Sequence, residues 1–220
     1  MARSISPQRS DALFAADSLV AVELTALDIP ELQRFFELNP EYFLAVYGRA
    51  AAPDEAYEAI HGALPPGWPF TKKWLIGFVD ETGSLAGMAN VVSDLLASGV
   101  WHIGLFMLAT WQHGSGAAQS LYARLERWAL DRGAQWLRLG VVQGNTRAER
   151  FWDRCGFIEV RKRDGVEMGE LTNTLRVMVK PLAAGALPEY LALVERDRPE
   201  PGGQMSAPPN AAEPVRSAPA

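Results

Sequence analysis

The chain has 220 residues, of which 48% are hydrophobic and 21% charged, and its formal net charge is -5. This composition is typical of a globular protein, and the negative charge provides no basic field that would attract nucleic acid or an anionic membrane. The single cysteine, Cys155, excludes an internal disulfide and a cysteine-based zinc cluster. Because we find no signal-peptide pattern and no apolar run of about 18 residues, we expect a soluble cytoplasmic protein without a metal.

The two ends of the chain differ from the middle. Residues 1–17 show no periodic apolar pattern, and we expect a flexible arm there. In residues 183–220 we predict one short helix at Leu187–Val194. From Arg196 onward the chain holds six of its fifteen prolines and no Phe, Trp, Tyr, Leu or Ile. Such a segment buries too little apolar surface to offset its ordering entropy, so the C-terminal tail is predicted to be mostly disordered.

Strand and helix patterns interleave over residues 18–182, which we expect to form one domain. The predicted strands are 19–26, 74–80, 85–92, 100–108, 136–142, 157–163 and 173–180. The predicted helical regions are 28–38, 41–64 with a break near Ala51–Pro53, 114–132 and 146–155. Hairpins beside one strand-helix-strand unit predict an α/β fold, with a mixed, largely antiparallel sheet of six to seven strands flanked by about four helices.

A glycine turn separates the 100–108 strand from the long helix that follows. It consists of His113, Gly114, Ser115, Gly116, Ala117 and Ala118. A helix N-terminus presents unpaired N–H groups and about half a positive charge, which together bind phosphate oxygens. A Walker loop is excluded because no Gly-Lys-Ser/Thr follows, and the third glycine of the dinucleotide fingerprint is absent. A tight turn without any ligand would show the same pattern.

A second motif begins at Asn145, where the 136–142 strand has just ended. Thr146 and Glu149 are interpreted as a capping box for a helix that stops at Gly156. One face of this helix carries Ala148, Phe151, Trp152 and Cys155.

Together the two motifs resemble the signature of the GNAT (Gcn5-related N-acetyltransferase) superfamily. That signature is Arg/Gln-x-x-Gly-x-Gly/Ala before a long helix and, after the next strand, Asn-x-x-Ala-x-x-Phe/Leu-Tyr-x-x-x-Gly-Phe. The strong match covers about 100–163, and the strand order extends it to about 19–182. His113 stands where the family usually has Arg or Gln, and Trp152 where it usually has Tyr.

The resemblance implies an acetyl-CoA-dependent N-acetyltransferase that acts on the primary amine of a small molecule, with a sheet that splays in the middle to hold CoA. The implied cofactor-binding residues are Leu108, Ala109, Thr110, His113, Gly114, Ser115, Gly116, Ala117, Ala118, Asn145 and Trp152. The backbone N–H of Leu108 would polarise the thioester carbonyl. Asn145 would bind the pantetheine arm or merely end its strand.

The catalytic base is less clearly indicated. The resemblance places His102 where some family members carry a catalytic Glu, and an imidazole that titrates near pH 6.5 suits a base. Alternatively, His102 faces the core or solvent. Asp94, Glu58 and His61 are weaker candidates. Trp152 cannot supply a proton to the leaving thiolate, so Tyr122 would do so, or no acid is needed.

The acceptor is indicated only by composition. The aromatic-rich segment 39–70 would form its wall, with Glu55 and Glu58 attracting a cationic amine, and Trp101 and Trp111 would flank the cofactor strand. Three alternatives stay open: a catalytically silent CoA-binding module, an acetyltransferase for protein amines, and a nucleotide at the same helix N-terminus. The acyl chain and the oligomeric state, a homodimer included, are left undetermined.

Overall fold

The computed structural model describes residue 5 and residues 12–199. Its strands form one eight-stranded sheet in the order β1-β2-β3-β4-β5-β6-β8-β7. The strands are β1 (Phe14–Ala16), β2 (Leu19–Glu23), β3 (Lys72–Val79), β4 (Leu85–Ser93), β5 (Val100–Leu108), β6 (Trp136–Val142), β7 (Ile158–Met168) and β8 (Leu171–Pro181). The α-helices are α1 (Ile29–Leu38), α2 (Glu41–Tyr47), α3 (Glu55–His61), α4 (Ala117–Leu130), α5 (Thr146–Arg154) and α6 (Leu187–Leu193). Three short 3-10 helices are η1 (Ala26–Asp28), η2 (Thr110–Gln112) and η3 (Glu195–Asp197).

The sheet is antiparallel except where β5 and β6 run parallel. This parallel pairing joins only Val100–Ile103 to Trp136–Leu139. Beyond Ile103, β5 continues to Leu108 and β6 to Val142 without pairing with each other. The expected mixed, largely antiparallel and splayed sheet is therefore confirmed.

The counts of strands and helices exceed the prediction. The three-residue strand β1 is too short to produce a period-2 pattern that sequence inspection could detect. The predicted helical region 41–64 divides into α2 and α3, which agrees with the break predicted near Ala51–Pro53. Helix α2 already ends before that break, because Gly48 adopts a left-handed φ of 70°.

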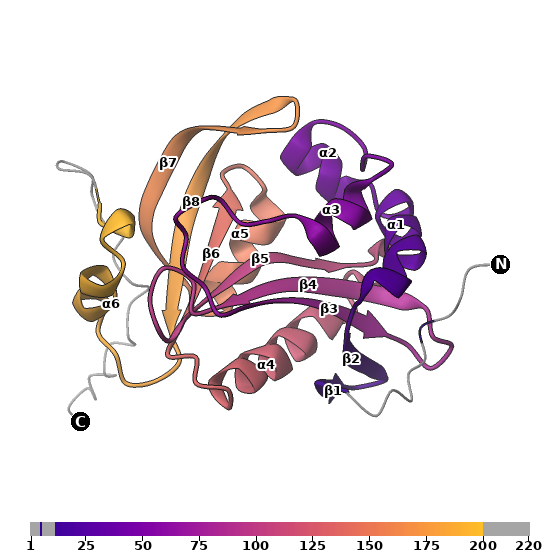
Figure 1. The fold of residues 1–220 in the computed structure, drawn as a ribbon, viewed down its shortest axis with the longest axis horizontal. Coiled ribbons are helices and arrows are strands. Elements are labelled where there is room, and N and C mark those ends of the chain that lie inside the picture. The colour runs from indigo at the N-terminus through magenta and orange to yellow at the C-terminus, as the bar shows by residue number, and fades with distance from the viewer. Residues whose placement is uncertain (1–4, 6–11, 200–220) are drawn as a thin grey trace, which may run out of the picture.

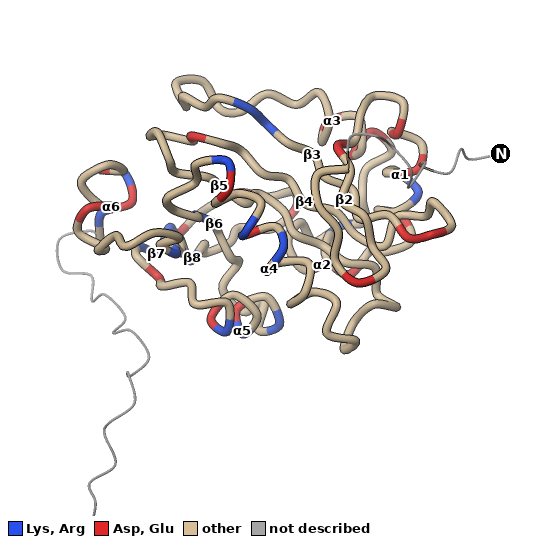
Figure 2. The backbone as a smooth tube through the Cα atoms, turned by 90° about the horizontal axis from the view of Figure 1, so that it is seen from below, with Lys and Arg blue, Asp and Glu red and all other residues tan. Residues whose placement is uncertain are grey.

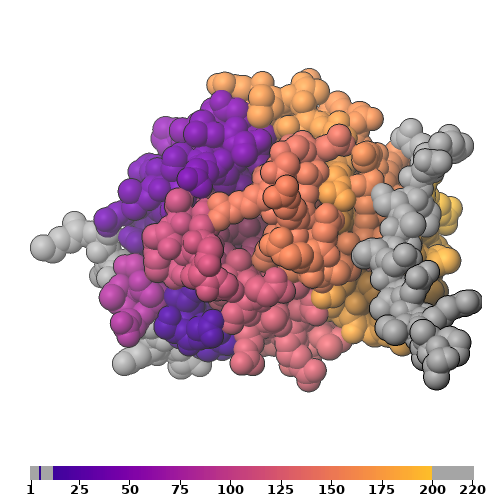
Figure 3. All heavy atoms as spheres, turned by 180° about the vertical axis from the view of Figure 1, so that it is seen from behind, coloured from indigo at the N-terminus to yellow at the C-terminus, as the bar shows by residue number. Residues whose placement is uncertain are grey.

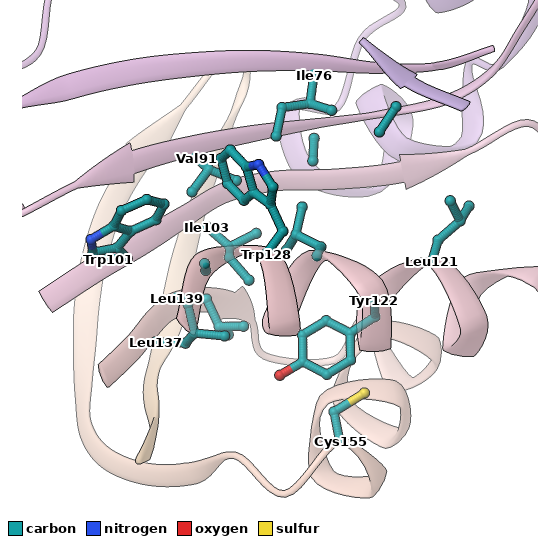
Figure 4. Packing of buried hydrophobic residues seen from close by; sticks show 14 of the residues in the cluster. Ile76, Val91, Trp101, Ile103, Leu121, Tyr122, Trp128, Leu137, Leu139 and Cys155 are labelled. Atoms are coloured by element: carbon teal, nitrogen blue, oxygen red, sulfur yellow. The ribbon is translucent and has the colours of Figure 1, made fainter. Parts of the chain in front are cut away.

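The helices cover both faces of the sheet. Helices α4 and α5 pack on one face, and α1, α2 and α3 lie over the other (Figure 1). On α4, the residues that repeat every three or four positions are buried, among them Leu121, Leu125 and Trp128. Figure 4 shows the side chains of Leu121 and Trp128 directed from the helix toward the sheet. The indole of Trp128 meets those of Trp74 and Trp101 edge to face, at centroid distances of 5.1 and 5.5 Å. Within the described residues, no helix is long and apolar enough to cross a bilayer.

The ordered structure extends beyond the expected limits of 18–182 at both ends. Strand β1 pairs with β2, and Ile5 is buried. At the other end, α6 and η3 pack against the sheet, and Asp197 is fully buried. The remaining parts of the expected arm and tail, residues 1–4, 6–11 and 200–220, lie outside the described residues.

Asp197 is the centre of a buried ionic cluster that anchors the C-terminal segment. Arg138 of β6 donates two hydrogen bonds to its carboxylate, at 2.6 and 3.0 Å, and the hydroxyl of Tyr190 donates a third at 2.6 Å. Arg163 of β7 adds an ion pair at 2.9 Å, and Figure 2 shows blue segments on β7 and β8 beside α6. Burial alone would raise the pKa of Asp197, but these partners outweigh it and hold the pKa below its usual value.

We predict that Asp197→Ala lowers the free energy of unfolding by about 3–5 kcal/mol, because it leaves Arg138 charged and buried without its partner. Asp131→Ala is the control: it removes an exposed ion pair with Arg127, which is worth about 0–1 kcal/mol. Urea denaturation measures both. Since the pKa of Asp197 lies below its unfolded value of about 3.9, its contribution is complete above that pH and is lost as the pH falls further. Equal losses in the two variants would contradict the anchoring role.

Candidate active site

A cavity of about 490 Å³ opens where β5 and β6 have parted. Figure 3 shows a hollow on this face between α2, the loop after β5 and α5. The cavity is lined by residues of five segments: Asn39, Glu41, Tyr42 and Ala45; Phe106, Met107 and Leu108; Thr110, Gln112, His113, Gly114 and Gly116; Ala118 and Gln119; and Asn145, Arg147, Ala148, Phe151, Trp152 and Arg154.

The glycine loop presents free backbone amides to this cavity. Gly114 and Gly116 have φ values of 82° and 89°, and a Cβ on either would meet no atom within 4 Å. The N–H groups of Gly114, Gly116 and Ala118 have no hydrogen-bond acceptor among the described residues. Ser115 supports the turn, since its hydroxyl donates to Gln112 O at 2.7 Å and accepts from Ala117 N–H. Three unpaired N–H groups on residues that line the cavity fit a phosphate group.

His113 and Asn39 hold this loop in place. Nε2 of His113 lies 3.2 Å from the carbonyl oxygen of Leu108, so Nε2 carries the hydrogen and donates it. Oδ1 of Asn39 accepts from Thr110 N–H at 2.8 Å, while its Nδ2 donates to Phe35 O at 2.8 Å. Asn39 was not expected at the site, because its only sequence signal is that Asn39-Pro40 ends a helix.

The backbone of Leu108 points toward the gap between β5 and β6. Ala109 N–H donates to Ala86 O on β4 at 2.9 Å. Because successive residues of a strand direct their N–H and C=O groups to opposite edges, the N–H of Leu108 points away from β4. That edge has no strand partner beyond Ile103. The arrangement fits the expected oxyanion donor.

Asn145 caps α5. Its Oδ1 accepts from Ala148 N–H at 3.2 Å, while Nδ2 has no partner within the described residues. The predicted capping box with Thr146 as the cap is wrong, since Asn145 occupies that position and Glu149 instead accepts from Gly144 N–H. Oδ1 thus serves the helix, and Nδ2 remains available at the cavity.

Trp152 forms part of the cavity wall and of the core beneath it. Its side chain is 7% exposed and packs against Tyr122 and Phe151 at centroid distances of 5.4 and 4.9 Å. Tyr122 itself is buried and does not line the cavity. Burial, reinforced by the charge of Glu126, raises the pKa of Tyr122 far above its usual value. Neither residue is suited to protonate a leaving thiolate.

The structure does not bring His102 to the cavity. Its Nδ1 lies 3.3 Å from a guanidinium nitrogen of Arg138, and burial together with that positive charge lowers the pKa of His102 to about 3. An imidazole with this pKa is a weak base, so we do not retain His102 as the base. The other candidates are also remote: Asp94 accepts from Gly99 N–H in a turn, and neither Glu58 nor His61 lines the cavity.

Most of the expected acceptor wall also lies elsewhere. Of the aromatic residues in segment 39–70, Tyr42 lines the cavity. Burial raises its pKa well above the usual value, and the neighbouring Tyr47 adds to the shift. Glu55 pairs with Arg49 at 3.3 Å, so its charge is largely offset. Trp101 is buried beneath the sheet, whereas Trp111 is 65% exposed and lies outside the cavity.

Known proteins share this architecture. A comparison with curated protein sequences finds no significant match. Among solved structures, an acetyltransferase from Thermus thermophilus is 22% identical, with a TM-score of 0.58 over 76% of this chain and 99% of that one. A spermidine N-acetyltransferase from Vibrio cholerae, in complex with CoA and spermine, is 16% identical, with a TM-score of 0.58 over 75% and 96%. The ribosomal-protein-S18-alanine N-acetyltransferase from Escherichia coli is 13% identical, with a TM-score of 0.55 over 77% and 97%.

A sheet that splays between two parallel strands, with a glycine loop and a helix N-terminus at the opening, defines the class of acyltransferases with the GNAT fold. The profile of the Acetyltransferase (GNAT) family matches residues 32–157, more than half of the chain. This chain therefore belongs to the GNAT acetyltransferase family and is an acyltransferase. In the described part of the chain, no group of three or more His, Cys, Asp or Glu side chains could hold a metal ion.

We predict that Asn39→Ala lowers the free energy of unfolding by about 1–3 kcal/mol, because Thr110 N–H and Phe35 O both lose a buried partner. Asn173→Ala is the matched control, since that side chain makes one part-buried bond, to Val46 O. Its expected loss is about 0.5–1.5 kcal/mol. Thermal or urea unfolding measures both, and a loss in Asn39→Ala no larger than in the control would remove the bridging role.

Proposed function

We propose that this protein transfers an acetyl group from acetyl-CoA to the primary amine of a small molecule. The observation that carries the proposal is the set of three unpaired amides, at Gly114, Gly116 and Ala118, beside the unpaired edge of β5. These amides would bind the diphosphate of CoA, with Ser115 and Ala117 completing the turn. The pantetheine arm would follow Leu108, Ala109 and Thr110, with Asn145 Nδ2 and Trp152 beside it.

The chain's own groups suit amine acetylation. When a neutral amine attacks a thioester carbonyl, an N–C bond forms, the C–S bond breaks, and the amine proton passes to solvent. The N–H of Leu108 would stabilise the developing oxyanion, a contribution commonly worth about 2.7–4 kcal/mol per donor. A thiol has a pKa of about 8.5, so a thiolate can leave without a protein acid. The absence of Tyr at position 152 does not prevent the reaction.

A contact above the sheet favours a small acceptor over a protein. The β7–β8 hairpin reaches across to the end of α2 (Figure 1), where Glu170 N–H donates to Tyr47 O at 2.8 Å. Asn173 Nδ2 also donates to Val46 O at 3.0 Å. These bonds close a bridge over the acceptor side of the gap, and such a bridge admits a small amine more readily than a folded protein surface.

We predict that the protein binds CoA in the micromolar range and that Gly116→Glu weakens binding at least about 100-fold, or about 2.7 kcal/mol. The added carboxylate would occupy the phosphate position and repel the diphosphate. Gly133→Glu is the matched control: Gly133 has a φ of 96°, equally open surroundings, and lies beyond the opposite end of α4. Both variants therefore carry similar backbone strain. Calorimetry should show a loss of CoA affinity in Gly116→Glu and an unchanged affinity in Gly133→Glu.

The same titration with ATP and NAD tests the nucleotide alternative. We expect no heat of binding from either nucleotide at concentrations that saturate with CoA. Wild-type affinity for CoA in Gly116→Glu would contradict the loop assignment, and binding of NAD or ATP in preference to CoA would replace the proposed ligand.

We further predict that primary amines stimulate release of free thiol from acetyl-CoA, and that kcat/KM rises with pH toward the amine's own pKa of about 10, because only the neutral amine attacks. No second break is expected near pH 6.5, since the pKa of His102 is lowered to about 3. A thiol-detection assay from pH 5.5 to 9 measures this. CoA binding without stimulation by any amine would indicate a silent CoA-binding module.

A further inference from the structure

The walls of the cavity at the glycine loop differ in charge. Two arginines, Arg147 and Arg154, line it along α5, whereas the one carboxylate among its lining residues, that of Glu41, belongs to α2. Helices α2 and α5 border the hollow on different sides (Figure 3). The wall formed by α5 is therefore the positively charged one.

The two arginines lie on one face of α5 and have no counter-ion. They are seven residues apart, which is two turns of the helix and about 10.5 Å along its axis. Both residues are exposed, and neither makes a hydrogen bond or an ion pair within the described part of the chain. The acidic residues of the same helix are used elsewhere, since Glu149 and Asp153 each lie 3.4 Å from the guanidinium group of Arg176 on β8. Two uncompensated positive charges therefore line the cavity.

A contact between two helices places these charges beside the glycine loop. Sγ of Cys155 donates to Oε1 of Gln119 at 3.8 Å, so the end of α5 adjoins the first turn of α4. Arg154 is next to Cys155 in the chain and lines the same cavity as the unpaired amides of the loop. At the other end of α5, Arg147 follows two residues after the helix cap, Asn145. The arginines thus extend the anion-binding surface of the loop along α5.

CoA carries a second anionic group, for which the loop amides supply no partner. Besides the diphosphate, its ribose bears a 3′-phosphate, and a phosphate monoester has a charge of about −1.5 to −2 at pH 7. Three neutral N–H groups and the partial charge of one helix N-terminus suit the diphosphate. A monoester is matched by guanidinium groups, whose paired N–H donors fit phosphate oxygens two at a time. Two arginines beside the loop supply a charge of opposite sign and similar size.

We propose that Arg147 and Arg154 bind the 3′-phosphate of CoA and make the protein selective for CoA over dephospho-CoA, which lacks that phosphate. The proposal rests on the acetyl-transfer function above, because it assigns the adenosine end of the same cosubstrate. It also orients that cosubstrate, with the adenosine end along α5 and the thioester at Leu108. The carboxylate of Glu41 on the other wall repels the phosphate and so disfavours the reverse orientation.

Calorimetry with CoA and with dephospho-CoA tests the selectivity of the wild-type protein. The two ligands differ only in the 3′-phosphate, so the ratio of their dissociation constants isolates its contribution. We expect CoA to bind at least about tenfold more tightly, which is the effect of one charge-assisted hydrogen bond. Equal affinities, or tighter binding of dephospho-CoA, would overturn the proposal.

Variants then assign the selectivity to side chains. Arg147→Ala and Arg154→Ala should each lower the ratio at least about threefold, and the double variant should bring it to about 1, while Kd for dephospho-CoA stays within about twofold of wild type. Arg154→Lys keeps the charge without the paired donors and should retain part of the ratio. Arg124→Ala is the matched control, because Arg124 is likewise exposed but lies on α4 and does not line the cavity. It should leave the ratio unchanged.

The subsite and the proposed function fail in different ways. A loss of affinity of the same size for both ligands would mean that the arginines act on the diphosphate, and an equal change of the ratio in Arg124→Ala would mean a general effect of charge. Either result, or a wild-type ratio in the double variant, would overturn the 3′-phosphate assignment while CoA binding by the wild-type protein stands. Wild-type protein that binds neither ligand would overturn the proposed function and the subsite with it.

Discussion

The architecture of the site depends on one constraint: β5 and β6 stop pairing after Ile103. Unpaired backbone groups inside a protein are costly, so each group on the free edge must find a partner or face a cavity. The carbonyl of Leu108 is satisfied by the side chain of His113. The N–H of Leu108 has no acceptor in the part of the chain that the structure describes, and it points into the gap. The free edge that destabilises the apoprotein is what gives the gap its capacity to bind an extended ligand.

Several features keep the strands apart. The register of β4 against β5 shifts between Asn90 and Val91, so that β5 bulges near Gly104. On the face that α4 covers, the rings of Phe106 and Phe151 stack at a centroid distance of 5.8 Å. On the other face, Gly104 and Gly140 are exposed, and neither carries a side chain that would cover the surface of the sheet there. The gap is thus supported by aromatic packing on the face that α4 covers and is open on the opposite face.

The sequence predicted those parts of the structure that depend on local patterns. The glycine loop, the amphipathic face of α4 and the mixed sheet all follow from periodicity and turn residues. The polar contacts of His102 do not follow from local patterns, because Arg138 lies 36 residues further along the chain and Asp197 another 59 beyond it. Asn39 is similarly 71 residues from Thr110. Contacts of this kind arise only when the sheet brings distant strands together, and composition near the C-terminus even favoured disorder where Asp197 is buried.

The two departures from the family pattern have a common explanation in this structure. Where the family usually has Arg or Gln, His113 bonds to the carbonyl of Leu108 and so fixes the strand end rather than extending a charge toward a phosphate. Where the family usually has Tyr, Trp152 packs in the cavity wall. Both substitutions leave the amides of Gly114, Gly116, Ala118 and Leu108 untouched. If binding of the diphosphate and stabilisation of the oxyanion are both carried by backbone N–H groups, side chains at positions 113 and 152 are free to vary, provided that they preserve the course of the backbone.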